Sequence, residues 1–184
     1  NMPRDSEIFT QITQRTDRSL NKISSRLLAN EIDPTLEIRT SIQDTEKIPV
    51  DRTIKVGIYP IAGDPLTWGH LALALDSIAE AGLDKVIFVA AGDDPRKPEM
   101  TKVDLRHPMN IETLEMFKPF FGFSSIAVGT DFDGETNIFR ILELNPNQKV
   151  EAYYMVGCDH YNRFVTGKDG QQKADTVLKL EDNM

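Results

Sequence analysis

A threonine and a histidine stand three positions apart, at Thr67 and His70, where an apolar run gives way to a helical pattern. The run over residues 54–59 is rich in β-branched and aromatic side chains and stops at Pro60, so it predicts a strand followed by a turn. The residues that follow the histidine recur at helical spacing: Leu71, Leu75 and Ile78. A helix N-terminus presents unpaired N–H groups and a partial positive charge, so this placement predicts a phosphate-binding site.

The same pair has a structural alternative. Thr67 is a good helix N-cap, and His70 can be an ordinary surface histidine. Gly69 lies between them and would let a nucleotide press against the backbone. Residue types and spacing alone leave both interpretations open.

Strand and helix patterns alternate from Ile54 onward and predict the elements that position this pair. The predicted strands cover residues 54–59, 85–91, 123–128 and 150–156, and the predicted helices cover about 67–81, 102–118 and 135–144. A capping box is expected at Thr101 and Asp104, and Gly82 is expected to end the first of these helices. Four apolar strands separated by helices predict an α/β fold with a Rossmann-like, doubly wound parallel sheet. Ligands bind such sheets at the carboxyl ends of the strands, so the loops at 60–70, 92–101, 129–136 and 157–161 should share one rim.

Residues 1–53 differ from the rest, because they contain no glycine and carry apolar residues at helical intervals. They predict an N-terminal helical extension of one or two helices, and residues 54–184 are expected to form the domain that carries the candidate site. A short extended segment is expected over residues 36–42. We favour an extension that covers one edge of the domain over one that docks a partner or joins copies of the chain. Formation of a homo-oligomer is left as an open alternative.

Composition excludes several classes of function. A net charge of −8 argues against a protein that wraps nucleic acid. One cysteine excludes an internal disulfide framework, and no long apolar segment or signal pattern is visible, so we expect a soluble, cytoplasmic protein without membrane contact. Three histidines with no pair at i, i+4 predict no metal site built by the protein.

The stretch 56–70 resembles the signature of the nucleotidylyltransferase superfamily, in which a strand leads into a Gly-rich turn, Phe-Asp-Pro and (His or Thr)-x-Gly-His. Its Tyr-Pro and Thr-x-Gly-His details are similar to phosphopantetheine adenylyltransferases. Later motifs resemble nicotinate or nicotinamide mononucleotide adenylyltransferases. These motifs are Pro95-Arg96-Lys97-Pro98, Arg106-His107-Pro108-Met109, Thr136 with Ile141-Leu142, and Gly157-Cys158-Asp159.

The resemblance implies an enzyme of NAD biosynthesis in which the phosphate of a mononucleotide attacks the α-phosphorus of ATP and pyrophosphate leaves. It implies that His70 and Thr67 are catalytic, and that Mg²⁺ arrives with ATP and is held mostly by substrate phosphates and water. The implied partners are therefore ATP and a small phosphorylated acceptor. The implied nucleotide-binding residues are Tyr59, Pro60, Asp64, Gly69, Gly157 and Asp159, and the implied acceptor-binding residues are Lys97, Arg106 and Thr136.

Two departures from the family pattern leave alternatives open. Gly63 stands where the family has Phe, and the family's Ile-Ser-(Ser or Thr)-x-x-Arg motif is missing before Met184. Either the chain is truncated at its C-terminus or it lacks a catalytic arm. The alternatives are a non-catalytic nucleotide-binding or regulatory module of the same fold, and an adenylyltransferase for another acceptor such as phosphopantetheine.

Overall fold

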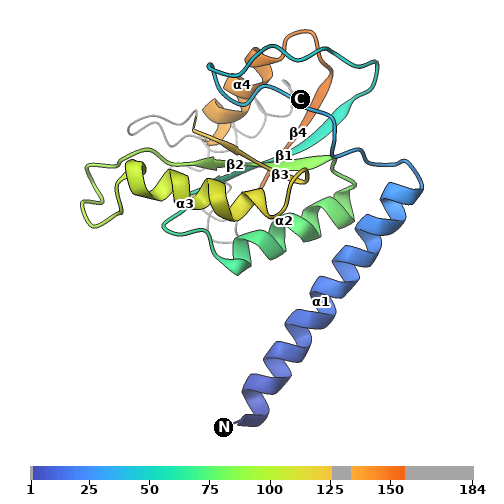
Figure 1. Cartoon of the computed structure of the whole chain (residues 1–184), viewed down its shortest axis with the longest axis vertical. Helices are drawn as coiled ribbons and strands as arrows, with labels where there is room; N and C mark the ends of the chain where they lie inside the picture. Colours follow the sequence, from blue (N-terminus) through green and yellow to red (C-terminus); the bar gives the residue numbers. More distant parts are fainter. Residues whose placement is uncertain (1, 126–133, 156–184) are drawn as a thin grey trace, which may run out of the picture.

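A computed structural model of the chain describes residues 2–125 and 134–155 (Figure 1). Helices and strands alternate after the first helix. In chain order the elements are α1 (Met2–Leu28), β1 (Ile54–Ile61), α2 (Trp68–Ala81), β2 (Lys85–Ala90), α3 (Val103–Glu115), β3 (Phe121–Ser124), α4 (Gly134–Leu144) and β4 (Val150–Tyr154).

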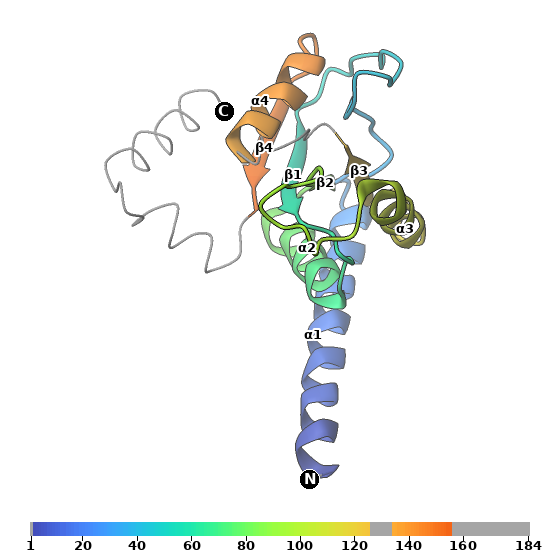
Figure 2. The same ribbon diagram turned by 90° about the vertical axis from the view of Figure 1, so that its left-hand side faces the viewer.

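The four strands form one sheet in the order β3-β2-β1-β4, and every neighbouring pair is parallel. Chain order runs outward from β1 to β3 and then reverses to β4, so the switch in strand order lies beside β1. Helices cover both faces, with α2 on one side and α4 on the other (Figures 1 and 2). The predicted Rossmann-like, doubly wound α/β fold is confirmed.

Each face of the sheet has its own apolar core, because strands buried on both sides alternate their side chains between two layers. On one face, Tyr59, Phe88 and Phe121 pack against the helices α2 and α3. On the other face, Val56 and Ile58 pack with α4. β1 and β2 are almost wholly buried, so the carboxyl ends of these two strands are held in a rigid register, with Ile61 opposite Ala90.

The N-terminal segment contains one helix, α1, whose C-terminal half packs on α2 while its N-terminal half extends beyond the rest of the molecule (Figure 1). Ser19 and Ile23 are buried in this contact. Lys22 forms an ion pair with Glu80 of α2 at 2.7 Å. The predicted extended segment at 36–42 forms no strand, and Asn145 fixes it through hydrogen bonds with the backbone of Arg39.

The ends of α2 follow local sequence signals, whereas the start of α3 depends on a contact with a distant residue. α2 starts after Thr67 and ends before Gly82, which adopts a left-handed conformation at φ 66°, as predicted. The predicted capping box at Thr101 is wrong, because Lys102 is the N-cap and the Thr101 N–H donates to Asp64 instead.

The strand boundaries shift by a few residues. β1 continues through Pro60 to Ile61, and β3 begins two residues before its predicted start. Residues 126–128 and 156, at the predicted ends of the third and fourth strands, lie outside the described residues. No helix in the described ranges carries an apolar stretch of the length that a bilayer crossing requires.

Candidate functional site

The site is built on the first turn of α2. Thr67 is the extended N-cap residue, and the first intrahelical bond runs from the Leu71 N–H to the Thr67 carbonyl at 3.3 Å. His70 occupies the third helical position. Its Nδ1 accepts the Thr67 N–H at 3.0 Å and lies 3.0 Å from the Thr67 hydroxyl. Sequence left the phosphate-site and capping interpretations open, and this geometry gives His70 a capping contact through one nitrogen only.

The contact at Nδ1 assigns the tautomer of the His70 ring. Because the Thr67 N–H points at Nδ1, that nitrogen must be unprotonated, and the proton of the neutral ring sits on Nε2. Burial lowers the pKa of His70, which favours the same neutral form. The ring therefore offers a neutral N–H donor at Nε2, next to the N-terminus of a helix.

Tyr59 supports the His70 ring from β1. The two ring centroids are 5.9 Å apart at an interplanar angle of 72°, an edge-to-face contact. On its other side Tyr59 stacks on Phe88 of β2, with centroids 5.3 Å apart. Only 8% of Tyr59 is exposed, so its ring is packed between His70 and Phe88.

The turn between β1 and α2 is held by a residue that the sequence did not single out. The Asn110 amide of α3 donates to the Gly63 carbonyl at 2.8 Å, and its oxygen accepts the Leu66 N–H at 3.2 Å. Gly63 has φ 65°, and a Cβ there would lie 2.4 Å from Asn110 Nδ2. The glycine that replaces the family's Phe is thus required by the turn conformation and by the neighbouring Asn110.

Arg106 lies one helical turn before Asn110 and is fully buried. Its guanidinium donates to the carbonyls of Ala62, Ala91 and Gly92, and its Nε donates to the Thr101 carbonyl at 2.9 Å. The expectation that Arg106 binds an acceptor directly is corrected here, because its side chain is enclosed and its donors point at backbone oxygens. No apolar pattern in the sequence of α3 marks the face that Arg106 shares with the buried Asn110 and Leu114.

The loop after β2 meets the turn after β1 through Asp64. The exposed carboxylate of Asp64 accepts the Thr101 N–H at 2.9 Å, and hydrogen bonding by Thr101 holds the pKa of Asp64 below its usual value. Lys97 is exposed in the same loop, within a turn in which its N–H donates to the Asp94 carbonyl at 2.9 Å. The buried Asp94 carboxylate binds Arg96 and shapes that turn.

These contacts bring the loops at the carboxyl ends of β1 and β2 together, as expected for neighbouring strands of a parallel sheet. Pro60 and Gly69 lie in the same region, in the last part of β1 and the first turn of α2. Thr136 lies in the first turn of α4, but its side chain is not described, and Gly157 and Asp159 are outside the described residues. Across the described residues, no group of three or more His, Cys, Asp or Glu side chains could hold a metal ion.

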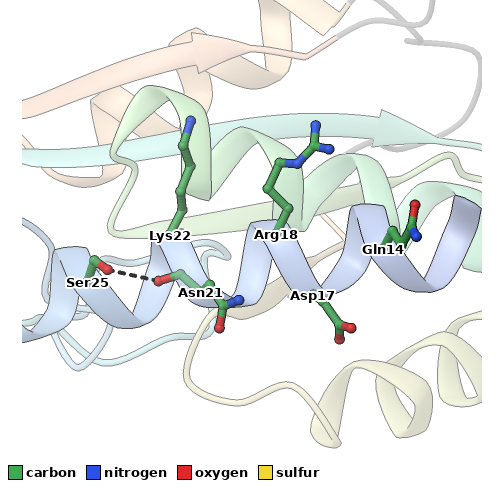
Figure 3. A pocket seen from close by; sticks show the side chains of 6 residues that line it. All are labelled: Gln14, Asp17, Arg18, Asn21, Lys22 and Ser25. Carbon is green, nitrogen blue, oxygen red and sulfur yellow. Dashed lines mark hydrogen bonds between the residues drawn. The ribbon is translucent and has the colours of Figure 1, made fainter.

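A separate shallow hollow runs along α1 (Figure 3). Its lining residues are all polar and all come from this one helix: Gln14, Asp17, Arg18, Asn21, Lys22 and Ser25. None of them belongs to the loops around His70, so the hollow is not part of the candidate site.

Comparison with known proteins gives the same family as the motifs. The chain is 33% identical over 135 residues to a probable nicotinate-nucleotide adenylyltransferase of Thermoanaerobacter sp. (strain X514), covering 71% of this chain and 61% of the relative. Relatives with the same name in Clostridium botulinum (strain Eklund 17B / Type B) and Moorella thermoacetica are 32% and 30% identical over 68% and 71% of this chain, and the matches cover 60% and 59% of those proteins. The chain is similar to nicotinate-nucleotide adenylyltransferases.

This similarity confirms the predicted resemblance to the nucleotidylyltransferase superfamily, and within it to the nicotinate-nucleotide branch. The chain spans about three fifths of the length of these adenylyltransferases. No family model matches the chain.

Proposed function

We propose that this protein transfers AMP from ATP to the phosphate of nicotinate mononucleotide. The observation that carries the proposal is the Thr67–His70 pair, in which the cap contact leaves Nε2–H of a neutral histidine free to donate at a helix N-terminus. The similarity to proteins named probable nicotinate-nucleotide adenylyltransferase supports the choice of acceptor.

In the proposed reaction, an oxygen of the acceptor phosphate attacks the α-phosphorus of ATP. The bond from the α-phosphorus to its bridging oxygen breaks, and pyrophosphate leaves with the electron pair. Negative charge builds on the triphosphate as this bond lengthens, so a fixed N–H donor lowers the barrier. His70 Nε2–H donates to a triphosphate oxygen, and the N–H groups in the first turn of α2 add their partial positive charge. Thr67 orients the ring, and its exposed hydroxyl is a second donor.

Lys97 binds the acceptor phosphate as a flexible, exposed cation. Arg106 takes no direct part, for the reason given above. Thr136, Gly157 and Asp159 keep their proposed contacts to acceptor and nucleotide. The same proposal places the protein in the cytoplasm as an enzyme of NAD biosynthesis and leaves homo-oligomerisation to be measured.

Mg²⁺ is proposed to arrive with ATP, since this ion keeps several waters and is usually bound through one or two carboxylates and substrate phosphates. The Asp64 carboxylate fits that role, because it is exposed and, although it already accepts hydrogen bonds from Thr101, a carboxylate oxygen can accept a further bond from a metal-bound water. The ion neutralises triphosphate charge when bound.

The experiment incubates the full natural protein with ATP, Mg²⁺ and one of three acceptors: nicotinate mononucleotide, nicotinamide mononucleotide or phosphopantetheine. Pyrophosphate release and the dinucleotide mass are measured, and deamido-NAD from the first acceptor is the expected main product. Gly63 favours one second candidate, a nucleotide-binding module without turnover. ATP binding seen in the fluorescence of Trp68, with no product from any acceptor, would decide for that module.

A further inference from the structure

We infer that Arg106 and Asn110 of α3 form a buried clamp that positions Thr67 and His70 relative to the loop that carries Lys97. The two clamp residues lie one helical turn apart and are 0% and 1% exposed. Neither can touch a ligand in this arrangement, so both are positioning residues. The inference rests on the proposed function, since it explains how the triphosphate and acceptor parts of that site keep a fixed separation.

Arg106 joins three separate pieces of chain. Its Nη1 donates to Ala62 after β1 and to Ala91 after β2, the latter at 2.8 Å. Its Nη2 reaches the Gly92 carbonyl at 3.2 Å, and its Nε reaches the Thr101 carbonyl. A guanidinium offers five N–H donors on three nitrogens in one plane and so reaches carbonyls that lie far apart, whereas the ammonium of lysine offers three donors from one nitrogen.

The buried charge of Arg106 is balanced mainly by these carbonyl dipoles. Arg106 forms a long ion pair with the Asp93 carboxylate, at 3.8 Å from Nη2, and Asp93 also accepts the Val103 N–H at 3.1 Å. A cation buried in this way is costly unless every donor is used. The arrangement therefore resists any movement of the two loops away from α3.

Asn110 holds the turn immediately before the catalytic pair. Through its bonds to Gly63 and Leu66 it sets the direction in which the chain enters Thr67. A second bond joins the same two segments: here Asp64 of the turn is the acceptor, and the Thr101 N–H in front of α3 is the donor. Asn110 of α3 therefore helps to position His70 indirectly, by holding the turn that precedes α2.

The test compares Asn110→Ala with Asn145→Ala in the full protein. Asn145 is a matched control, because it is 9% exposed and also bonds backbone groups of another segment, the Arg39 N–H and carbonyl, on the α4 side of the sheet. Both variants should lose stability. Only Asn110→Ala should lower kcat per folded molecule, by about 10- to 100-fold, because a displacement of about 1 Å costs that much.

Hydrogen–deuterium exchange gives a readout that needs no activity. In Asn110→Ala, the amides of residues 62–71 should exchange at least about tenfold faster than in the wild-type protein, while Asn145→Ala leaves them unchanged. Arg106→Lys should speed exchange in both 62–71 and 91–101 and raise KM for the acceptor. If the wild-type protein makes no dinucleotide, the proposed function fails and exchange still tests the clamp. Equal exchange and equal kcat in Asn110→Ala and wild type would overturn the clamp.

Gly63 provides an independent check of the same contact. Gly63→Ala places a Cβ against Asn110 Nδ2, and this clash disappears when Asn110 is also alanine. The left-handed conformation of Gly63 penalises alanine in both backgrounds, so only the part of the loss that comes from the clash disappears, and the loss of kcat caused by Gly63→Ala should be smaller in the Asn110→Ala background. Equal losses in the two backgrounds would contradict the proposed coupling.

Discussion

Replacing His70 separates its two contacts, because each ring nitrogen has a different task. Nδ1 accepts the Thr67 N–H, and Nε2 is the proposed donor to the triphosphate. His70→Asn places an amide oxygen near the position of Nδ1 and has no group at the position of Nε2. His70→Ala removes both. The pair of variants therefore distinguishes a histidine that caps a helix from one that acts on a ligand.

The expected magnitudes follow from these contacts. Loss of the Nε2 donor should lower kcat by about 100- to 1,000-fold in both variants, the scale of a single donor to developing negative charge. Loss of the edge contact with Tyr59 should cost each variant about 0.5–1.5 kcal/mol of unfolding free energy. His70→Ala should lose about a further 1 kcal/mol, because only it leaves the Thr67 N–H without its acceptor.

The assay measures pyrophosphate release at saturating ATP and acceptor, at equal concentrations of folded protein. Urea unfolding followed by the fluorescence of Trp68, the single tryptophan, gives the free energies of unfolding. If His70→Asn keeps wild-type kcat while His70→Ala loses it, the histidine acts through capping and the proposed donor role is refuted.

Three further predictions concern other groups. Because burial lowers the pKa of His70 below its ordinary value of 6.5, the unfolded chain binds the proton more readily, so the stability from this group is complete above pH 6.5 and falls as the pH drops toward the folded pKa. The pH profile of kcat/KM for ATP should be flat around neutrality and decline only below pH 6.5. Unfolding free energies measured against pH check the first statement, and initial rates measured against pH check the second. Lys97→Ala should raise KM for the acceptor about tenfold and change stability by less than about 0.5 kcal/mol, as steady-state kinetics and urea unfolding would show. Asp84→Ala should cost about 3 kcal/mol by urea unfolding and leave kcat per folded molecule unchanged, because it strands the Asp33 and Lys55 N–H groups and Arg52 at the amino end of the sheet.

Sequence determined the features that depend on local spacing. Strand and helix patterns gave the order of elements, and a parallel sheet follows because apolar strands alternate with helices. α2 could be placed to within a residue, since its N-cap Thr67 and its C-terminal Gly82 act through bonds to near neighbours in the chain. The Thr67–His70 contact is also local, since a spacing of three residues puts both side chains near the same face of the first helical turn.

Tertiary structure alone decided which face of α3 turns inward. Leu105 and Met109 are 66% and 47% exposed, whereas their neighbours Arg106 and Asn110 are buried. Hydrophobic periodicity does not orient this helix, because its apolar residues are spread around its circumference and the buried Leu114 shares the inward face with Arg106 and Asn110. Here the turn after β1 and the loop after β2 present carbonyls that only buried donors can satisfy, and that requirement, created by distant segments, outweighs the burial of two apolar side chains.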